Sequence, residues 1–197
     1  MVDINMINVV LISGYKRSGK DHTASLIRDV VGNEQVETMS FATPIKEIAA
    51  KLLNVSIEDL ELFKNNNEKI SIENKVVTDT RSLLQQLGND AIKPKFGKSV
   101  WADLVVNKIK SINDDDIKYI VIPDFRFNIE YDTLLNELSN DMRIMTLRIE
   151  NNDINNIDPH PSETELLHTN FKFDYTLDNT GYCLTKENIS IFLETLI

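Results

Sequence analysis

The feature that most constrains the fold is a short apolar segment followed at once by a glycine-bounded loop and an amphipathic segment. Residues 7–13 read INVVLIS, a largely β-branched run typical of a buried strand in a parallel sheet. Residues 14–20 read GYKRSGK and fit the pattern G-x-x-x-x-G-K. Residues 20–31 place apolar side chains at helical spacing, and Gly32 and Asn33 end that helix. The order of strand, loop and helix predicts a phosphate-binding loop.

The residue types in this loop suit an anion. Gly14 and Gly19 let the backbone curl so that its N–H groups point inward, and the helix N-terminus adds partial positive charge. Lys20 is placed to reach the β- and γ-phosphates of a nucleotide. Lys16 and Arg17 add charge within the loop, and Arg17 is the better candidate for a phosphate clamp because its guanidinium binds phosphate through two hydrogen bonds. The alternative is a chance glycine turn before a helix.

Two further residues belong to this candidate nucleotide-binding set. Ser18 lies inside the loop, and Asp21 follows Lys20 at the position where a Ser or Thr hydroxyl usually binds Mg²⁺. A carboxylate can also hold Mg²⁺, directly or through water, so Asp21 is a candidate metal ligand. The alternative is that Asp21 only favours the helix N-terminus through its charge. Thr23 lies too far into the helix to replace it.

Strand-like and helix-like segments alternate along the chain, which favours an α/β fold, and the phosphate-loop pattern at residues 14–20 favours the P-loop NTPase type. We expect a three-layer sandwich with a mostly parallel five-stranded sheet. Its strands are predicted over residues 7–13, 36–41, 118–122, 143–149 and 171–177. Helices are predicted over residues 20–31, 44–53, 81–88, 100–112, 129–138 and 186–196.

Two regions are predicted to stand apart from this sheet, within a single kinase-like domain that covers residues 1–197. Residues 54–100 offer no core strand and are expected to form an inserted, mainly helical lobe. Within that lobe Gly88 and Asn89 are expected to end a helix, and residues 93–98 to form a basic loop. Residues 150–165 are rich in Asn, Asp and Pro and are expected to form a loop that acts as a lid.

Charged residues follow two other predicted strands. Asp124 and Arg126 come directly after residues 118–122, and the carboxyl ends of parallel strands face the ligand crevice of such folds. Asp124 is therefore a candidate Mg²⁺ ligand and Arg126 a candidate grip on a phosphoryl group, and both join Lys20 as candidate catalytic residues, as does Arg17. The alternative is a local Asp124–Arg126 pair that caps the next helix. Arg148, near the end of residues 143–149, is a candidate phosphate or adenine contact, with a plain ion pair as its alternative.

Composition narrows the class of partner. The chain carries 21 Lys and Arg against 31 Asp and Glu, a net charge of −10, so we expect no nucleic-acid polymer as a partner. The chain has a single cysteine and three histidines without zinc spacing, so we expect a protein of the reducing cytoplasm. It has no long apolar run, so we expect that it does not bind membranes. Whether long apolar side chains serve only the core or also the face of a homodimer is left open.

Four segments resemble the deoxynucleoside monophosphate kinases of large tailed phages. They are GYKRSGKD at residue 14, RSLLQQLGND at residue 81, PDFRFNIE at residue 123 and HPSE at residue 160, and they occur in the order of that family. The first is also similar to the phosphate loop of animal phosphomevalonate kinase, where Asp likewise follows Lys. The asparagine of the third is displaced by one position, to Asn128, so no role is transferred to it.

The resemblance implies an enzyme that uses ATP and Mg²⁺ to convert a deoxynucleoside monophosphate into its diphosphate, in the host cytoplasm if a phage encodes it. It implies that residues 54–100 receive the acceptor, with Arg81 on its phosphate and Gln85 on its base or sugar. It also implies substrate-binding roles for Lys93, Trp101, His160, Ser162 and Glu163. Gln85 is as readily an exposed helix residue, whereas a single Trp at helical spacing with Leu104 and Val105, as Trp101 is, is usually a core residue. For Ser162 and Glu163 the alternative is an N-cap and an acidic first turn of a helix.

Two other functions stay open from the residues alone. One is a kinase for another small phosphoester, such as phosphomevalonate, because such a kinase catalyses the same phosphoryl transfer and differs only in the acceptor. The other is a nucleotide-binding switch without catalysis. The segments at residues 81 and 160 favour a nucleotide acceptor over the first, and Arg81 with the expected lid loop favours catalysis over the second.

Overall fold

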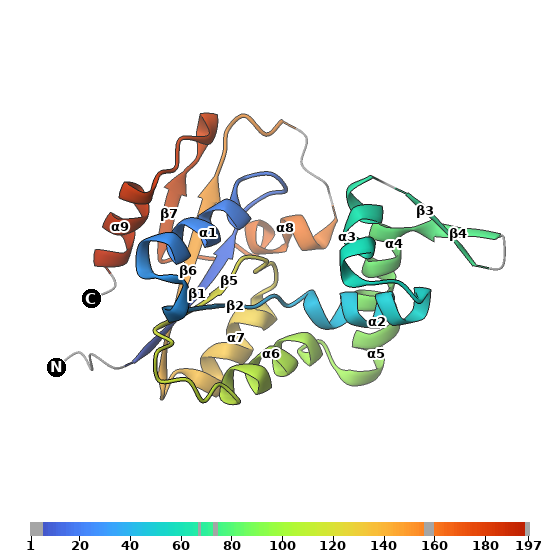
Figure 1. Ribbon diagram of the computed structural model, residues 1–197, viewed down its shortest axis with the longest axis horizontal. Helices are drawn as coiled ribbons and strands as arrows, with labels where there is room; N and C mark the ends of the chain where they lie inside the picture. Colours follow the sequence, from blue (N-terminus) through green and yellow to red (C-terminus); the bar gives the residue numbers. More distant parts are fainter. Residues whose placement is uncertain (1–5, 67, 73–74, 156–159, 196–197) are drawn as a thin grey trace. The chain divides into compact units, whose positions relative to one another are not determined.

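The computed structural model describes residues 6–66, 68–72, 75–155 and 160–195 of the chain (Figure 1). By its internal packing the chain divides into two compact units. The first contains Met1–Ser40 and Val105–Ile197, and the second is Phe41–Leu104. Helix α6 (Val100–Lys110) runs through the second boundary. Within the described residues, every helix is too short or too polar to span a lipid bilayer.

The first unit is built on a five-stranded sheet in the order β2-β5-β1-β6-β7, and every neighbouring pair in it runs parallel. The prediction of a mostly parallel five-stranded sheet is therefore confirmed. The strands are β1 (Ile7–Ser13), β2 (Val36–Thr38), β5 (Tyr119–Ile122), β6 (Met142–Glu150) and β7 (Tyr175–Asp178). Residues 9–12 of the central strand β1 are completely buried, as expected for a strand covered on both faces.

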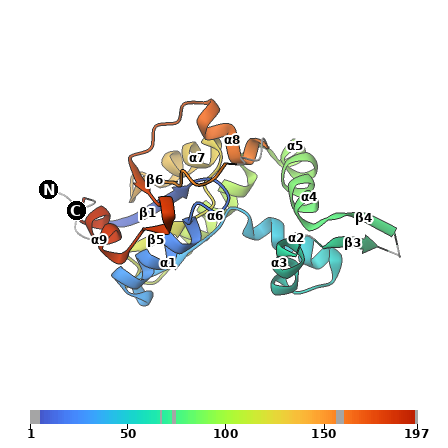
Figure 2. The ribbon, with the colours of Figure 1, turned by 90° about the horizontal axis from the view of Figure 1, so that it is seen from above.

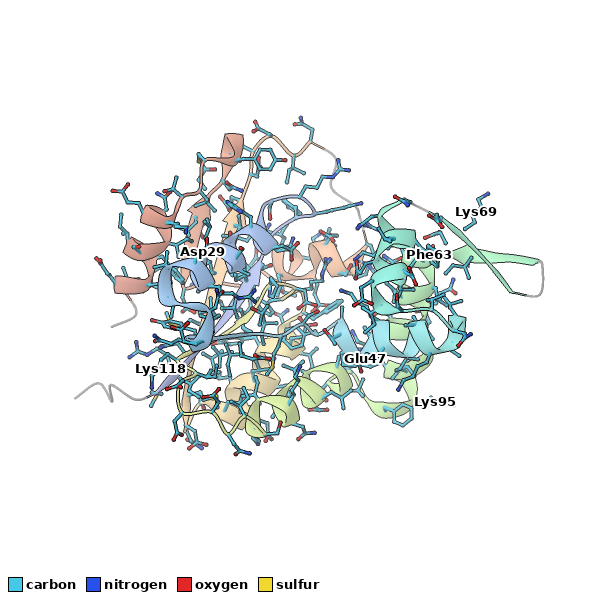
Figure 3. All side chains as sticks on the ribbon, viewed as in Figure 1. Asp29, Glu47, Phe63, Lys69, Lys95 and Lys118 are labelled. Atoms are coloured by element: carbon cyan, nitrogen blue, oxygen red, sulfur yellow. The ribbon has the colours of Figure 1, made fainter. Side chains whose placement is uncertain are left out.

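Helices cover both faces of this sheet, which gives the three layers of the predicted α/β fold (Figures 1 and 2). Helices α1 (Lys20–Val31) and α9 (Lys186–Glu194) pack side by side on one face, and α7 (Asn128–Leu138) lies on the other. Ala24 and Ile27 of α1 join the core with Ile189 and Phe192 of α9. At the surface the two helices are tied by an ion pair of 2.9 Å from Lys186 to Asp29, the latter labelled in Figure 3.

Shorter elements complete the first unit. These are η1 (Asn33–Gln35), α8 (Pro161–His168) and η3 (Thr180–Tyr182). Because all five strands are parallel, the segments that follow them start from the same edge of the sheet. The register supports this, since Ser13 at the end of β1 pairs with Arg148 of β6, and Leu11 pairs with Ile122 at the end of β5.

The second unit is mainly helical. It contains α2 (Thr43–Leu53), α3 (Ile57–Asn65), an antiparallel pair of strands β3 (Lys69–Ile72) and β4 (Lys75–Asp79), α4 (Thr80–Gln85), a π-helix (Gln86–Ile92) and α5 (Lys93–Phe96). Its core centres on Ala49, Ala50 and Leu60, against which leucines of α4 pack. Residues 54–100, for which an inserted lobe is predicted, fall within this unit. Charged side chains such as Glu47, Lys69 and Lys95 line its outside (Figure 3).

Two predictions in the second unit are wrong. The helix that starts near Arg81 does not end at Gly88, and residues 93–96 of the predicted basic loop form α5. Gly88 does not take up the left-handed conformation that ends helices, and its carbonyl instead accepts a hydrogen bond of 3.0 Å from the Trp101 indole. The segment turns at Gly97, whose φ of 100° is left-handed.

Three predicted boundaries in the first unit are also wrong, the first being that of strand β2, which ends at Thr38 rather than at residue 41. Strand β7 begins at Tyr175 rather than at Phe171, because the Asp174 carboxylate accepts the Thr146 backbone N–H at 2.8 Å and so takes the place of a backbone partner. Phe171 instead packs edge-on against Phe125. Helix α8 begins inside the predicted lid loop, at Pro161. Residues 156–159 of that loop lie outside the described residues.

Candidate active site

The loop between β1 and α1 has the backbone of an anion cradle. Gly19, at φ 103°, is the N-cap of α1, and Arg17 also takes up a left-handed conformation, at φ 69°. The Ser18 N–H donates to the Tyr15 carbonyl at 3.0 Å, which closes a tight turn inside the loop. Left-handed residues alternating with right-handed ones turn successive N–H groups toward one side, and this arrangement binds anions.

Gly14 is required by close packing. A Cβ at this position would lie 2.6 Å from the Ile149 carbonyl of β6 and 2.4 Å from the Ser18 hydroxyl. The Ser18 hydroxyl could rotate away, but the Ile149 carbonyl is backbone and cannot, so the loop leaves β1 through a residue without a side chain. Ser18 itself is completely buried, so its side chain packs beneath the loop rather than at its surface.

Lys20 points its ammonium group back into the loop. Its Nζ donates to the carbonyls of Gly14 and Tyr15, both at 2.7 Å, and its side chain is nearly buried. Burial, reinforced by the neighbouring Arg126 charge, lowers the pKa of Lys20 to about 8, against the opposing effect of Glu163. The ammonium therefore sits in a poorly solvated place beside a second cation, where an anionic ligand would stabilise it.

Arg126 lies at the start of the segment that follows β5 and is held by the residues that begin α8. Its Nη1 donates to the Ser162 carbonyl at 3.0 Å and forms an ion pair with the Glu163 carboxylate. The other Glu163 oxygen accepts the Lys16 backbone N–H of the phosphate loop at 3.1 Å. The Glu163 side chain is only 6% exposed. One buried carboxylate thus bridges a loop N–H and the guanidinium, as a phosphoryl oxygen would.

The start of α8 differs from the predicted cap. The N-cap is His160 rather than Ser162, since His160 Nδ1 accepts the Ser162 N–H at 3.2 Å and lies 2.8 Å from the Ser162 hydroxyl. Pro161 occupies the first turn, which tolerates a residue without an N–H. In the structure, His160 and Ser162 fix the helix that presents Glu163.

Asp124 and Asp21 are the two candidate metal ligands. Asp124 accepts the Ser40 hydroxyl at 2.7 Å, which ties the segments after β5 and β2 together. Asp21 lies exposed in the first turn of α1. The described residues contain no group of three or more His, Cys, Asp or Glu side chains that would hold a metal by itself. One or two carboxylates nevertheless fit Mg²⁺, which keeps several waters and takes further oxygens from phosphates.

Arg148 lies behind the loop. It is 5% exposed, its Nη1 donates to the Ser13 hydroxyl at 3.3 Å, and its guanidinium stacks 4.7 Å from the centre of the Tyr15 ring. Phe173 lies on it at 5.7 Å. Burial lowers the pKa of Arg148, although an arginine remains charged at neutral pH. The guanidinium therefore adds positive charge beneath the loop and holds Tyr15 in place.

The structure brings into the first unit all of the predicted loop residues together with Asp124, Arg126, Arg148, His160, Ser162 and Glu163. Three further residues shape this site and were not expected from the sequence. They are Tyr15, which stacks on Arg148; Ser40, which binds Asp124; and Asn179, whose side chain donates to the Ser18 carbonyl at 2.8 Å. Asn179 lies 161 residues from Ser18. No local sequence pattern signals a contact of that kind.

The second unit contains the predicted acceptor-side residues. Arg81 and Gln85 lie in α4, whose N-cap Asp79 accepts the Ser82 N–H at 2.9 Å. This hydrogen bond and a second one of 2.7 Å from the Ser82 hydroxyl lower the pKa of Asp79. Lys93 opens α5, and all of Arg81, Gln85 and Lys93 are partly exposed. Trp101 is 5% exposed and donates to Gly88, as a core residue would.

The comparison with models of known families finds a kinase family. A model of the family described as deoxynucleotide monophosphate kinase matches residues 54–183. Among solved structures, a protein named APE1195 superposes with a TM-score of 0.51 at 11% identity, over 98% of this chain and 96% of its own. The APS kinase CysC of Mycobacterium tuberculosis, solved with AMPPNP and APS, gives a TM-score of 0.42 at 10% identity, with 97% of each chain covered. At such identities APE1195 shows a shared fold alone. Among curated proteins, none matches the sequence significantly.

Proposed function

The chain belongs to the deoxynucleotide monophosphate kinase family, and from that membership we propose that it transfers the terminal phosphoryl group of ATP to a deoxynucleoside monophosphate. The matched residues, 54–183, do not include the phosphate loop at residues 14–20. Loop and family match are thus two separate lines of support. The matched part carries Arg81, Arg126 and the residues that begin α8.

The observation that carries the proposal is the meeting of Lys20 and Arg126 at the phosphate loop. The Arg126 charge lies close enough to Lys20 to lower the pKa of that lysine, and the Glu163 carboxylate ties Arg126 to the Lys16 N–H of the loop. Two positive groups beside a curled backbone suit a ligand with several negative charges at one end. A triphosphate has that distribution of charge.

Phosphoryl transfer asks a protein for in-line positioning and for neutralisation of charge, and for little covalent chemistry. In the proposal the loop N–H groups hold the β- and γ-phosphates. Lys20 turns from the loop carbonyls to the phosphate oxygens. Arg126 gives up its ion pair with Glu163 and binds the phosphoryl group that is transferred. Arg17 adds a second guanidinium at the mouth of the loop. The acceptor is already an anion, so a strong general base is not needed. Asp21 and Asp124 would hold Mg²⁺, which supplies further charge neutralisation when bound.

On the acceptor side, we assign the phosphate of the nucleoside monophosphate to Arg81 of α4 and Lys93 of α5. The capped start of α4 supports this assignment for Arg81, because Asp79 fixes the first turn of the helix that carries it. Gln85 lies one helical turn further on and is assigned to the base or sugar. Trp101 supports this region from its core rather than touching the acceptor.

An acceptor panel tests the proposal. The protein is incubated with ATP and Mg²⁺ and with each of the four deoxynucleoside monophosphates, their ribonucleotide counterparts or phosphomevalonate, and the products are separated. We expect a nucleoside diphosphate from at least one deoxynucleotide. Lys20→Met should reduce that turnover by about 100-fold or more, since it removes a group that stabilises transferring charge. Lys118→Met, which removes an equal charge after the acidic turn before β5, is the matched control and should keep the rate.

Other results would contradict the proposal in distinct ways. Product only from phosphomevalonate would reassign the acceptor, and ATP binding without any product would indicate a switch.

A further inference from the structure

A single buried asparagine joins the phosphate loop to the far end of the chain. Asn179 follows β7 and is 1% exposed. Its backbone N–H donates to the Glu150 carbonyl at the end of β6, at 2.7 Å. Its side-chain oxygen accepts the Leu184 N–H at 3.1 Å, and its side-chain N–H donates to the Ser18 carbonyl of the loop at 2.8 Å. The contacts with Glu150 and Leu184 fix the backbone and the side-chain oxygen of Asn179. Its side-chain N–H therefore reaches the loop as a rigid donor.

This contact sets the orientation of one peptide group. In a trans peptide the C=O and the following N–H point in opposite directions. Asn179 holds the Ser18 carbonyl toward the protein interior, so the Gly19 N–H must point outward, to the side where the anion would lie. Because that N–H lies next to the N-terminus of α1, it belongs to the group of donors that bind phosphate.

Gly19 shows how closely the asparagine is fitted to the loop. A Cβ at Gly19 would lie 2.2 Å from the Asn179 side-chain nitrogen, and φ at Gly19 is 103°. The asparagine amide therefore fills the space that any other residue at position 19 would need. The second glycine of the loop serves this contact as well as the curl of the backbone.

We propose that Asn179 is a positioning residue for nucleotide phosphates: it fixes the Ser18–Gly19 peptide so that the Gly19 N–H faces the triphosphate. The inference rests on the proposed function only in taking the loop as the triphosphate site. It does not depend on which acceptor receives the phosphoryl group. An asparagine with a merely structural task would tie β7 to α9 through Leu184 and leave phosphate binding untouched.

Calorimetry with inorganic tripolyphosphate and Mg²⁺ tests this, because the probe engages the loop without a base or an acceptor. Asn179→Ala removes the donor, and Asn179→Asp keeps an acceptor for Leu184 but turns an oxygen toward the Ser18 carbonyl. Asn188 provides matched controls, since its side chain caps α9 through the Thr185 N–H at 3.0 Å. Asn188→Ala removes a side-chain amide from the same terminal segment, and Asn188→Asp adds the same charge there.

We expect both Asn179 variants to bind tripolyphosphate about tenfold to 100-fold more weakly, as the loss of an oriented donor to an anion implies. Their KM for ATP should rise while the KM for the acceptor stays constant. Both Asn188 variants should bind tripolyphosphate with an affinity within about twofold of that of the parent. Circular dichroism confirms folding, and Asn179→Ser offers a milder loss of the donor if the alanine variant unfolds.

The proposal is overturned if folded Asn179 variants bind tripolyphosphate like the parent, or if the Asn188 variants lose as much affinity. It is overturned, too, if the parent protein does not bind tripolyphosphate. Failure of the proposed function looks different. A parent protein that binds tripolyphosphate through Asn179 but phosphorylates no deoxynucleotide would sustain this inference and refute the acceptor assignment.

Discussion

Among single residues, Lys20 offers the clearest dependence on pH. Its pKa of about 8 means that roughly half of the free protein carries the ammonium at pH 8, and little of it at pH 9.5. A bound triphosphate favours the charged form and raises this pKa. Binding of ATP should therefore take up a proton between pH 8 and the ordinary lysine pKa. Affinity should fall as the pH rises above 8, by up to about tenfold per unit.

Calorimetric titration of ATP and Mg²⁺ at pH 9, in two buffers with different enthalpies of ionisation, measures that uptake directly. Lys20→Arg is the control, because a guanidinium keeps its charge at this pH and should bind without taking up a proton. Affinity that is constant or increases between pH 8 and 9.5 would contradict this view of Lys20.

Glu163 gives the second prediction for a single residue. Its carboxylate accepts the Lys16 N–H and pairs with Arg126, so it occupies two donors that a phosphate would use. Glu163→Gln keeps a side chain of the same shape without the negative charge. We expect ATP to bind the variant about threefold to tenfold more tightly, since a weaker competitor is displaced. Fluorescence titration with a labelled ATP analogue measures the change, and Glu137→Gln, on the surface of α7, serves as control. Unchanged or weaker binding would show that Glu163 does not compete with the nucleotide.

Among the helices, we expect the continuous helical segment over residues 80–96 of the second unit to depend on the Trp101 indole. Trp101 of α6 is buried and donates to Gly88 within the π-helix, which lets α4, the π-helix and α5 follow one another without a turn. Trp101→Phe should lower the free energy of unfolding by about 1–2 kcal/mol, through the lost hydrogen bond and the smaller ring. Chemical denaturation measures this loss, with Leu104→Ala as the control because Leu104 is 44% exposed on the same helix. An equal loss in both variants would contradict the anchoring role of Trp101.

The elements that the sequence predicts well are those whose signals are local. Strand β1, the loop with Gly14 and Lys20, and helix α1 follow from adjacent residues, because strand burial, the glycine pattern and amphipathic spacing each act over a few positions. Where the helix continues past Gly88, the Gly88 carbonyl instead accepts a hydrogen bond from Trp101, thirteen residues away. A glycine signals a helix end only when its φ is left-handed, and that property is set by the packing around it.

Across the whole molecule, the site is assembled by contacts that bridge most of the sequence. Glu163 reaches a loop residue 147 positions earlier, and Asn179 reaches Ser18 across 161 positions. The parallel sheet makes this convergence possible, because it delivers the ends of β1, β5, β6 and β7 to one edge. The sequence identifies Arg126 as a candidate phosphate-binding residue, and the family resemblance identifies Glu163 as a candidate substrate-binding residue. Their pairing, and the part played by Asn179, emerge only when the strands are aligned.

The central claim is that the phosphoryl group passes from ATP to a second nucleotide on this protein. Phosphorus NMR of a mixture of ATP, Mg²⁺ and an active deoxynucleoside monophosphate follows donor, acceptor and products together. We predict that the signals of ADP and of the deoxynucleoside diphosphate grow at equal rates, while inorganic phosphate stays flat. In Lys20→Met both signals should grow at least about 100-fold more slowly. Growth of ADP together with inorganic phosphate, or spectra that stay constant for every deoxynucleotide, would contradict the account.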